Sequence, residues 1–315
     1  MTDRLHRLRW LLSGVGCVAA VSLIGCGSIE RRPDPSVTRQ SDPPLERGQL
    51  QSDASSAKPN KFTTRIGQYV FHTDFKIADT ADPLFRDLED LPDQIEGELR
   101  LPANSNLIQV FLFDDEDRYH AFLRAKDPKL PLRSAYFFAE PARGSGLPPD
   151  LHVYTWTGPR LKTDLRHELT HALLHGTLKG VPLWLDEGLA GFFEQPVLND
   201  GVNVLHLDAL RTHEPLRAGP FRGDMARLEK LSQVNQMGRP EYQEAWAWVH
   251  FMLRSDPKAR QVLLDHLQAL RTTSTPGLLL PKLEAAIGDP NSQLLAYLNR
   301  LELPTASSRV RQVGR

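Results

Sequence analysis

Cysteine is almost absent from this chain of 315 residues, which contains only Cys17 and Cys26. The sequence beyond Cys26 has none, which excludes an intramolecular disulfide, a cysteine-based metal site and a cysteine nucleophile from that part. Charge of one sign is also scarce, since 38 basic residues oppose 39 acidic ones. This balance argues against nucleic-acid binding, which relies on neutralising many phosphates.

The start of the chain has the pattern of an export signal. Basic side chains at Arg4, Arg7 and Arg9 precede residues 10–25, which are apolar or small and carry no charge. A helix of that length spans about 24 Å, short of the hydrocarbon core of about 30 Å. We therefore expect residues 1–25 to be a signal peptide rather than a permanent membrane span.

The signal ends in Leu23-Ile24-Gly25-Cys26, which resembles a bacterial lipobox. In lipoproteins with this pattern the cysteine is acylated and becomes the new N-terminus, and several acyl chains anchor a protein firmly. Gly27 stands where lipoproteins kept in the inner membrane often carry Asp. The resemblance implies a lipoprotein of the bacterial cell envelope, at the outer membrane facing the periplasm. A plain signal peptide, or a membrane anchor with an incidental cysteine, is the alternative.

The rest of the chain divides by composition into a tether, a domain and a tail. Residues 26–61 are rich in Pro, Ser, Asp, Arg and Gln, with almost no aliphatic run. Such a segment cannot bury enough apolar surface to offset its ordering entropy, so we expect a disordered tether. Residues 62–302 carry the patterns of a folded domain, and residues 303–315 form a small, basic tail that we expect to be flexible.

The apolar patterns of residues 62–302 change from strands alternating with helices to helices alone. This order predicts an α+β fold, with an N-terminal mixed sheet, then a mainly helical half, and the active site between them. Pro92 is expected to split the first helix. Strands are expected at 68–72, 107–113, 134–139 and 150–157, and helices at 82–99, 115–126, 165–178, 182–195, 224–233, 240–253, 257–270, 277–287 and 291–301.

The clearest chemistry lies in residues 167–171, His-Glu-Leu-Thr-His. His167 and His171 are four residues apart, so on a helix they project from one face and can bind a single Zn²⁺. Glu168 lies beside the first ligand, where its carboxylate can take a proton from a water that attacks a carbonyl. Chance matches to a pattern of this length occur in ordinary helices, so a metal site is predicted only if the surrounding sequence also supports it.

A catalytic zinc ion needs a third protein ligand and one open position. Glu187 lies sixteen residues beyond His171, and a second helix packed across the first would deliver its carboxylate to the metal. A solvent-facing charge is the alternative for Glu187. Asp186 and Glu194 are rival carboxylates, although Glu194 lies about two turns beyond Glu187 and would not share an ion with it.

Residues 167–171 and the segment 184–190, Trp-Leu-Asp-Glu-Gly-Leu-Ala, together resemble the gluzincin metallopeptidases. The similarity is greatest to bacterial peptidase MA-like domains and covers roughly residues 65–300. It implies one Zn²⁺ held by His167, His171 and Glu187, with Glu168 as the catalytic base. The interval between the second histidine and the glutamate is shorter than in the aminopeptidases, and a Gly-x-Met-Glu-Asn motif is absent, which argues against aminopeptidase specificity.

Further side chains are candidates for supporting roles. His175 continues the histidine series, but about 12 Å of helical rise separates it from His167, so we expect it to be structural or to support a ligand. Tyr242 and His250, eight residues apart on one predicted helix, are candidates for the oxyanion donor, because gluzincins often use a tyrosine or histidine in this role. Packing in the core is the alternative for Tyr242.

The remaining histidines have no partner at ligand spacing, and we expect surface or core positions for His72, His120, His152, His206, His213 and His266. The segment 151–156 runs into the zinc-binding helix. By resemblance to related peptidases, it is expected to be an edge strand that binds extended substrate by main-chain pairing.

These features predict a zinc-dependent peptidase that acts on a peptide or protein substrate in the cell envelope, attached to the membrane through acylated Cys26. One alternative is a non-catalytic envelope protein that keeps the fold for binding or assembly, and the presence of Glu168 weighs against it. Another is a zinc amidase acting on cell-wall peptides.

Overall fold

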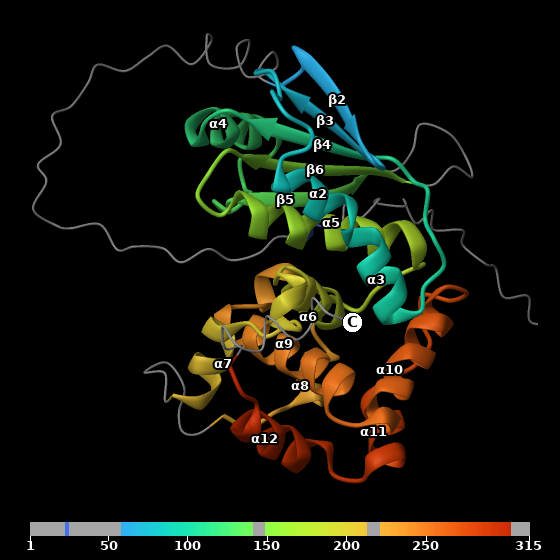
Figure 1. Ribbon diagram of the computed structural model, residues 1–315. Coiled ribbons are helices and arrows are strands. Elements are labelled where there is room, and N and C mark those ends of the chain that lie inside the picture. The colour runs from blue at the N-terminus through green and yellow to red at the C-terminus, as the bar shows by residue number, and fades with distance from the viewer. Residues whose placement is uncertain (1–22, 25–57, 141–148, 213–220, 304–315) are drawn as a thin grey trace, which may run out of the picture.

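Figure 1 shows a computed structural model of the protein, which describes residues 23–24 (backbone only), 58–140, 149–212 and 221–303. A mixed sheet with its flanking helices precedes a mainly helical half, so the predicted α+β class is confirmed. Cys26 and nearly all of the expected signal peptide, tether and tail lie outside the described residues. Within the described ranges, no helix has both the length and the apolar character needed to cross a bilayer.

The sheet has the strand order β1-β5-β6-β4-β3-β2. The β3–β4 and β4–β6 pairs are parallel, whereas β2–β3, β5–β6 and β1–β5 are antiparallel. The bounds of the strands are β1 Leu23–Ile24, β2 Phe62–Ile66, β3 Tyr69–Thr73, β4 Ile108–Phe113, β5 Ala135–Glu140 and β6 Asp150–Trp156.

Strand β6 lies inside the sheet, so the expectation of an edge strand at 151–156 is wrong. Its backbone pairs with β4 on one side and with β5 on the other. Beyond β5 the described chain adds only the two residues of β1. The aromatic, largely buried character of β6 fits a strand that helices cover on both faces of the sheet.

Alternate residues of the central strand β4 face two different cores. Val110 and Leu112 join the main core, which extends into the helical half. Phe111 and Phe113 join a smaller cluster with residues of α4 (Glu116–Lys126). This alternation follows from the two-residue period of a strand. Helix α4 lies on one face of the sheet and α5 (Leu161–Thr177) on the other (Figure 1).

The predicted helix at 82–99 is divided, but at Asp90 rather than at Pro92. Pro92 lies in the first turn of the second helix, where its missing N–H has no partner to lose. The helices on the sheet side are α2 Pro83–Glu89, α3 Leu91–Leu99, α4 and α5 Leu161–Thr177.

The helical half is built around α9, of which residues 242–253 are buried. The helices predicted for this half are found. The one expected at 224–233 is shorter than predicted, spanning only Met225–Leu228, and the helix at Val204–Arg211 was not expected. The helices are α6 Leu183–Phe193, α7 Val204–Arg211, α8 Met225–Leu228, α9 Arg239–Arg254, α10 Pro257–Leu270, α11 Leu280–Ile287 and α12 Pro290–Arg300, with 3-10 turns at Val197–Asn199 and Val234–Gln236.

Helix α6 packs very closely against α9 at Gly188. A Cβ atom at that position would lie 2.6 Å from the carbonyl oxygen of Ala245 and 2.8 Å from Cγ2 of Val249. Only glycine allows this approach. The close contact positions α6 on α9, and α6 lies beneath α5 (Figure 1). The two helices that carry the candidate ligands therefore face each other.

Candidate metal centre

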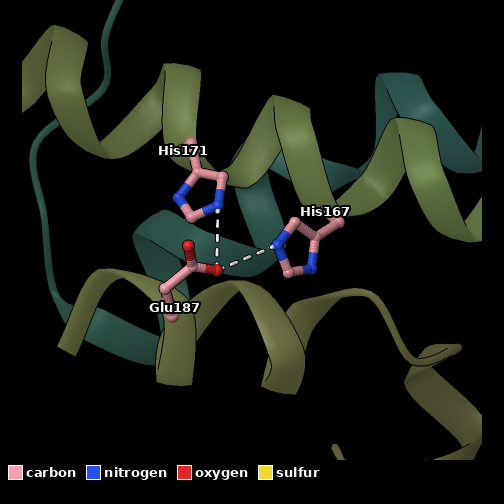
Figure 2. A group of neighbouring side chains, drawn as sticks. All are labelled: His167, His171 and Glu187. Carbon is pink, nitrogen blue, oxygen red and sulfur yellow. Dashed lines mark ion pairs between the residues drawn. The ribbon is translucent and has the colours of Figure 1, made fainter. Parts of the chain in front are cut away.

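His167, His171 and Glu187 come together as the sequence predicts. Both histidines project from α5 toward α6, which carries the glutamate (Figure 2). Oε2 of Glu187 lies 3.3 Å from Nε2 of His167 and 3.6 Å from Nε2 of His171. The three candidate ligand atoms lie within 4.8 Å of one another, and all three side chains are buried.

The chemistry of this group fits a metal ion. Within the described part of the chain, Nε2 of His171 and both carboxylate oxygens of Glu187 form no hydrogen bond. Buried polar atoms are costly unless something binds them. Two imidazoles and one carboxylate are also a donor set that holds a catalytic ion and leaves a position open. The buried group could therefore bind a metal ion.

Glu194 contacts the candidate ligand His167 at the ring nitrogen that faces away from Glu187. Its Oε2 lies 2.8 Å from Nδ1 of His167, while its Oε1 accepts hydrogen bonds from Asn203 and Gln195. Burial raises the pKa of Glu194, but the bond to His167 outweighs it and the pKa is lowered. A carboxylate that accepts a hydrogen bond from Nδ1–H leaves the lone pair on Nε2, the nitrogen facing Glu187. Glu194 supports a ligand and is not itself in the ligand group.

Asp186 forms an ion pair with the other candidate ligand, His171. Its Oδ1 lies 3.0 Å from Nδ1 of His171, and its Oδ2 lies 2.9 Å from Nε2 of His175. Burial raises the pKa of Asp186, but His171 and His175 hold it well below its usual range. Burial lowers the pKa of His171, and Asp186 and Glu187 together raise it to about 9. His175 thus contacts the group through Asp186, consistent with the supporting role expected for it.

Glu168 is fully buried next to the ligands. Neither of its carboxylate oxygens forms a hydrogen bond within the described residues. Burial raises the pKa of Glu168 to about 7, against the opposing charges of His167 and His171. A carboxyl group with a pKa near neutrality can both accept and release a proton at that pH.

A cavity of about 260 Å³ opens beside the ligands. Tyr242 lines it together with His167 and Glu187, so this predicted donor reaches the site. The other lining residues are Arg133, Arg160, Gly191, Glu194, Asn203, Leu205, His206, Met237, Gly238 and Arg239.

His250, the other predicted oxyanion donor, is not brought to this cavity. It is buried between Phe192 and Trp246, and its Nδ1 lies 2.8 Å from the hydroxyl of Tyr297. Burial lowers the pKa of His250 to about 3. Although it is eight residues from Tyr242 on the same helix, it is not among the described residues that line the cavity.

His206 and three arginines line the cavity although the sequence did not indicate them. Burial lowers the pKa of His206 to about 4, which leaves the imidazole neutral near pH 7. Arg133, Arg160 and Arg239 precede or begin three separate elements, so no spacing in the sequence links them to the ligands. His213 lies outside the described residues, and the cavity lining does not include His72, His120, His152 or His266.

A comparison with family models matches residues 163–276 to a domain described as a protein of unknown function, DUF1570. The match contains α6, α9 and all of α5 except its first two residues. A comparison with curated proteins found no match.

Proposed function

We propose that the protein is a zinc-dependent peptidase of the gluzincin type, closest to the bacterial peptidase MA-like domains. The observation that carries this proposal is the buried group of His167, His171 and Glu187. Beside it lies the carboxyl of Glu168, which has no hydrogen-bond partner among the described residues. Two histidines and a glutamate are a frequent ligand set of catalytic zinc in peptidases.

His167, His171 and Glu187 would hold the zinc ion, which would supply Lewis acidity toward a substrate carbonyl and a water molecule. Glu168 accepts the proton of the attacking water and then delivers it to the leaving amine, for which its pKa of about 7 is suited. Tyr242 lines the same cavity and is the candidate to donate a hydrogen bond to the oxyanion.

The proposal places the enzyme in the bacterial cell envelope, anchored through acylated Cys26. Removal of residues 1–25 would take β1 away and leave β5 as the outermost strand on that side of the sheet. Its free edge would then be the place for main-chain pairing with an extended peptide, instead of β6.

The test combines metal analysis with cleavage of an unbiased peptide library. The wild-type protein should contain about one zinc ion per chain, and Glu168→Gln should keep the metal and lose hydrolysis. Glu284→Gln, which changes an exposed glutamate on α11, is the matched control and should behave like the wild type. Folded protein without zinc, or hydrolysis that survives Glu168→Gln, would contradict the proposal.

The same experiment separates the two alternative functions. Incubation with purified cell-wall fragments tests for an amidase that cuts peptidoglycan amides instead of protein. Zinc that is bound without cleavage of either substrate would favour a binding or assembly protein on a peptidase fold.

A further inference from the structure

The cavity beside the ligand group gathers positive charge. Arg133, Arg160 and Arg239 line it from three different parts of the chain. Its only carboxylates among the described lining residues are Glu187 and Glu194. Both also lie close to the candidate ligand histidines, and together they set two carboxylates against three guanidinium groups in the described lining.

Arg133 is the arginine whose surroundings point most directly to a bound ligand. Nη1 of Arg133 is buried and forms no hydrogen bond within the described part of the chain. The guanidinium lines the same cavity as His167, Glu187 and Tyr242. Burial lowers its pKa, but Tyr242 and Glu187 outweigh this effect and the pKa is raised. A buried guanidinium N–H without an acceptor is costly, and an acceptor that enters the cavity would relieve this cost.

The other two arginines extend the positive charge toward solvent. Nε of Arg160 lies 3.4 Å from Oδ1 of Asp164, and 45% of its side chain is exposed. Arg239 is the exposed first residue of α9. Leu205 and Met237 give the same cavity an apolar portion. An extended ligand with one anionic group fits this combination better than a wholly apolar or a cationic one.

We propose that Arg133 selects substrates that carry a carboxylate close to the scissile bond, with Arg160 and Arg239 favouring their approach. This inference rests on the proposed peptidase function. A guanidinium binds a carboxylate through two parallel N–H···O hydrogen bonds, a geometry that lysine cannot reproduce. The carboxylate belongs either to an acidic side chain or to the C-terminus of the peptide.

A binding experiment tests the selection without requiring turnover. The probes are short, fluorescently labelled peptides in matched pairs, one pair differing by Glu against Gln and the other by a free against an amidated C-terminus. They are titrated against the full chain carrying Glu168→Gln and loaded with zinc. We expect the acidic member of one pair to bind about tenfold or more tightly than its neutral partner. The pair that shows the preference identifies the source of the carboxylate.

Variants of Arg133 in the same background show whether this residue is responsible. Arg133→Gln should abolish the preference while changing the affinity for the neutral peptide much less, and Arg133→Lys should restore it in part because the charge returns without the paired hydrogen bonds. Arg124→Gln removes an exposed guanidinium on α4, across the sheet from α5, and should leave the preference unchanged. Zinc analysis and circular dichroism of each variant identify any loss of metal or fold.

Equal binding of the acidic and neutral peptides, or no binding of either, would overturn the inference, as would a preference that persists in Arg133→Gln. These results are distinct from a failure of the proposed function. A chain that selects acidic peptides but never cuts them would uphold the selection and contradict the peptidase.

Discussion

Nδ1 of His167 lies 2.8 Å from a carboxylate oxygen of Glu194, on the opposite side of the imidazole from the nitrogen that faces Glu187. From the sequence, Glu194 was a rival for the metal; in the structure it contacts the candidate ligand His167 instead. Partners of this kind fix the tautomer and direction of an imidazole, and their loss typically weakens metal binding 10–100-fold.

Replacement of Glu194 by alanine should therefore weaken zinc binding by about 10–100-fold without abolishing it. Competition with a colorimetric chelator measures the affinity. Glu194→Gln keeps an oxygen that can accept from Nδ1 and should lose less. An affinity unchanged in Glu194→Ala would mean that the contact does not support the ligand.

Asp186 and Glu187 are adjacent buried carboxylates with different roles. Glu187→Ala removes a proposed ligand and should reduce zinc affinity more than Asp186→Asn, which only weakens the support of His171. The same competition assay ranks the two variants. The reverse order would identify Asp186 as the ligand.

Glu168 should make the stability of the metal-free protein depend on pH. Because burial raises its pKa from 4.5 to about 7, the folded chain holds this proton more tightly than the unfolded chain. Its contribution to stability is complete below about pH 4.5 and is lost as the pH rises to about 7.

Glu168→Gln stays uncharged, so its free energy of unfolding relative to the wild type should be higher near pH 8 than near pH 4, by about 3 kcal/mol. Urea unfolding of the chelator-treated proteins measures the difference. Glu284→Gln, at an exposed position, should show no such trend. A difference independent of pH would show that the pKa of Glu168 is not raised in the folded chain.

Gly188 and Gly97 are helical glycines in opposite surroundings. A methyl group at Gly188 would meet the backbone of Ala245 at 2.6 Å, whereas one at Gly97 would have no described atom within 4 Å. Gly188→Ala should lower the free energy of unfolding by about 1–3 kcal/mol, and Gly97→Ala should raise it by about 0.5–1 kcal/mol. Thermal unfolding compares them, and an equal effect at both positions would refute the packing argument.

The fold class and the ligand group could be predicted because both depend on local patterns. The four-residue spacing of His167 and His171 needs only a helix, and the strand character of residues 107–113 needs only their composition. Strand β2 is mostly exposed and lacks an apolar alternation, so nothing in its sequence marked it. The position of β6 depends on which strands pair beside it, and this is not a local property.

The surroundings of the ligands could not be predicted for the same reason. Tyr242 and His250 are eight residues apart on α9, so their spacing alone does not distinguish them. The packing of α6, α7 and α12 decides that Tyr242 lines the cavity and that His250 contacts Tyr297. Arg133 and His206 reach the cavity from segments far apart in the sequence. Their roles follow from tertiary contacts alone.

The close approach at Gly188 has a mechanical consequence. Helix α5 packs on β5 and β6 and carries two of the proposed ligands, while α6 packs on α9 and carries the third. An ion bound by all three would link the sheet layer to the helical layer. The close packing at Gly188 would connect α6 in turn to α9. Metal release should then weaken the contact between α5 and α6 before either layer unfolds. The amide hydrogens of these two helices would be the first to exchange with solvent.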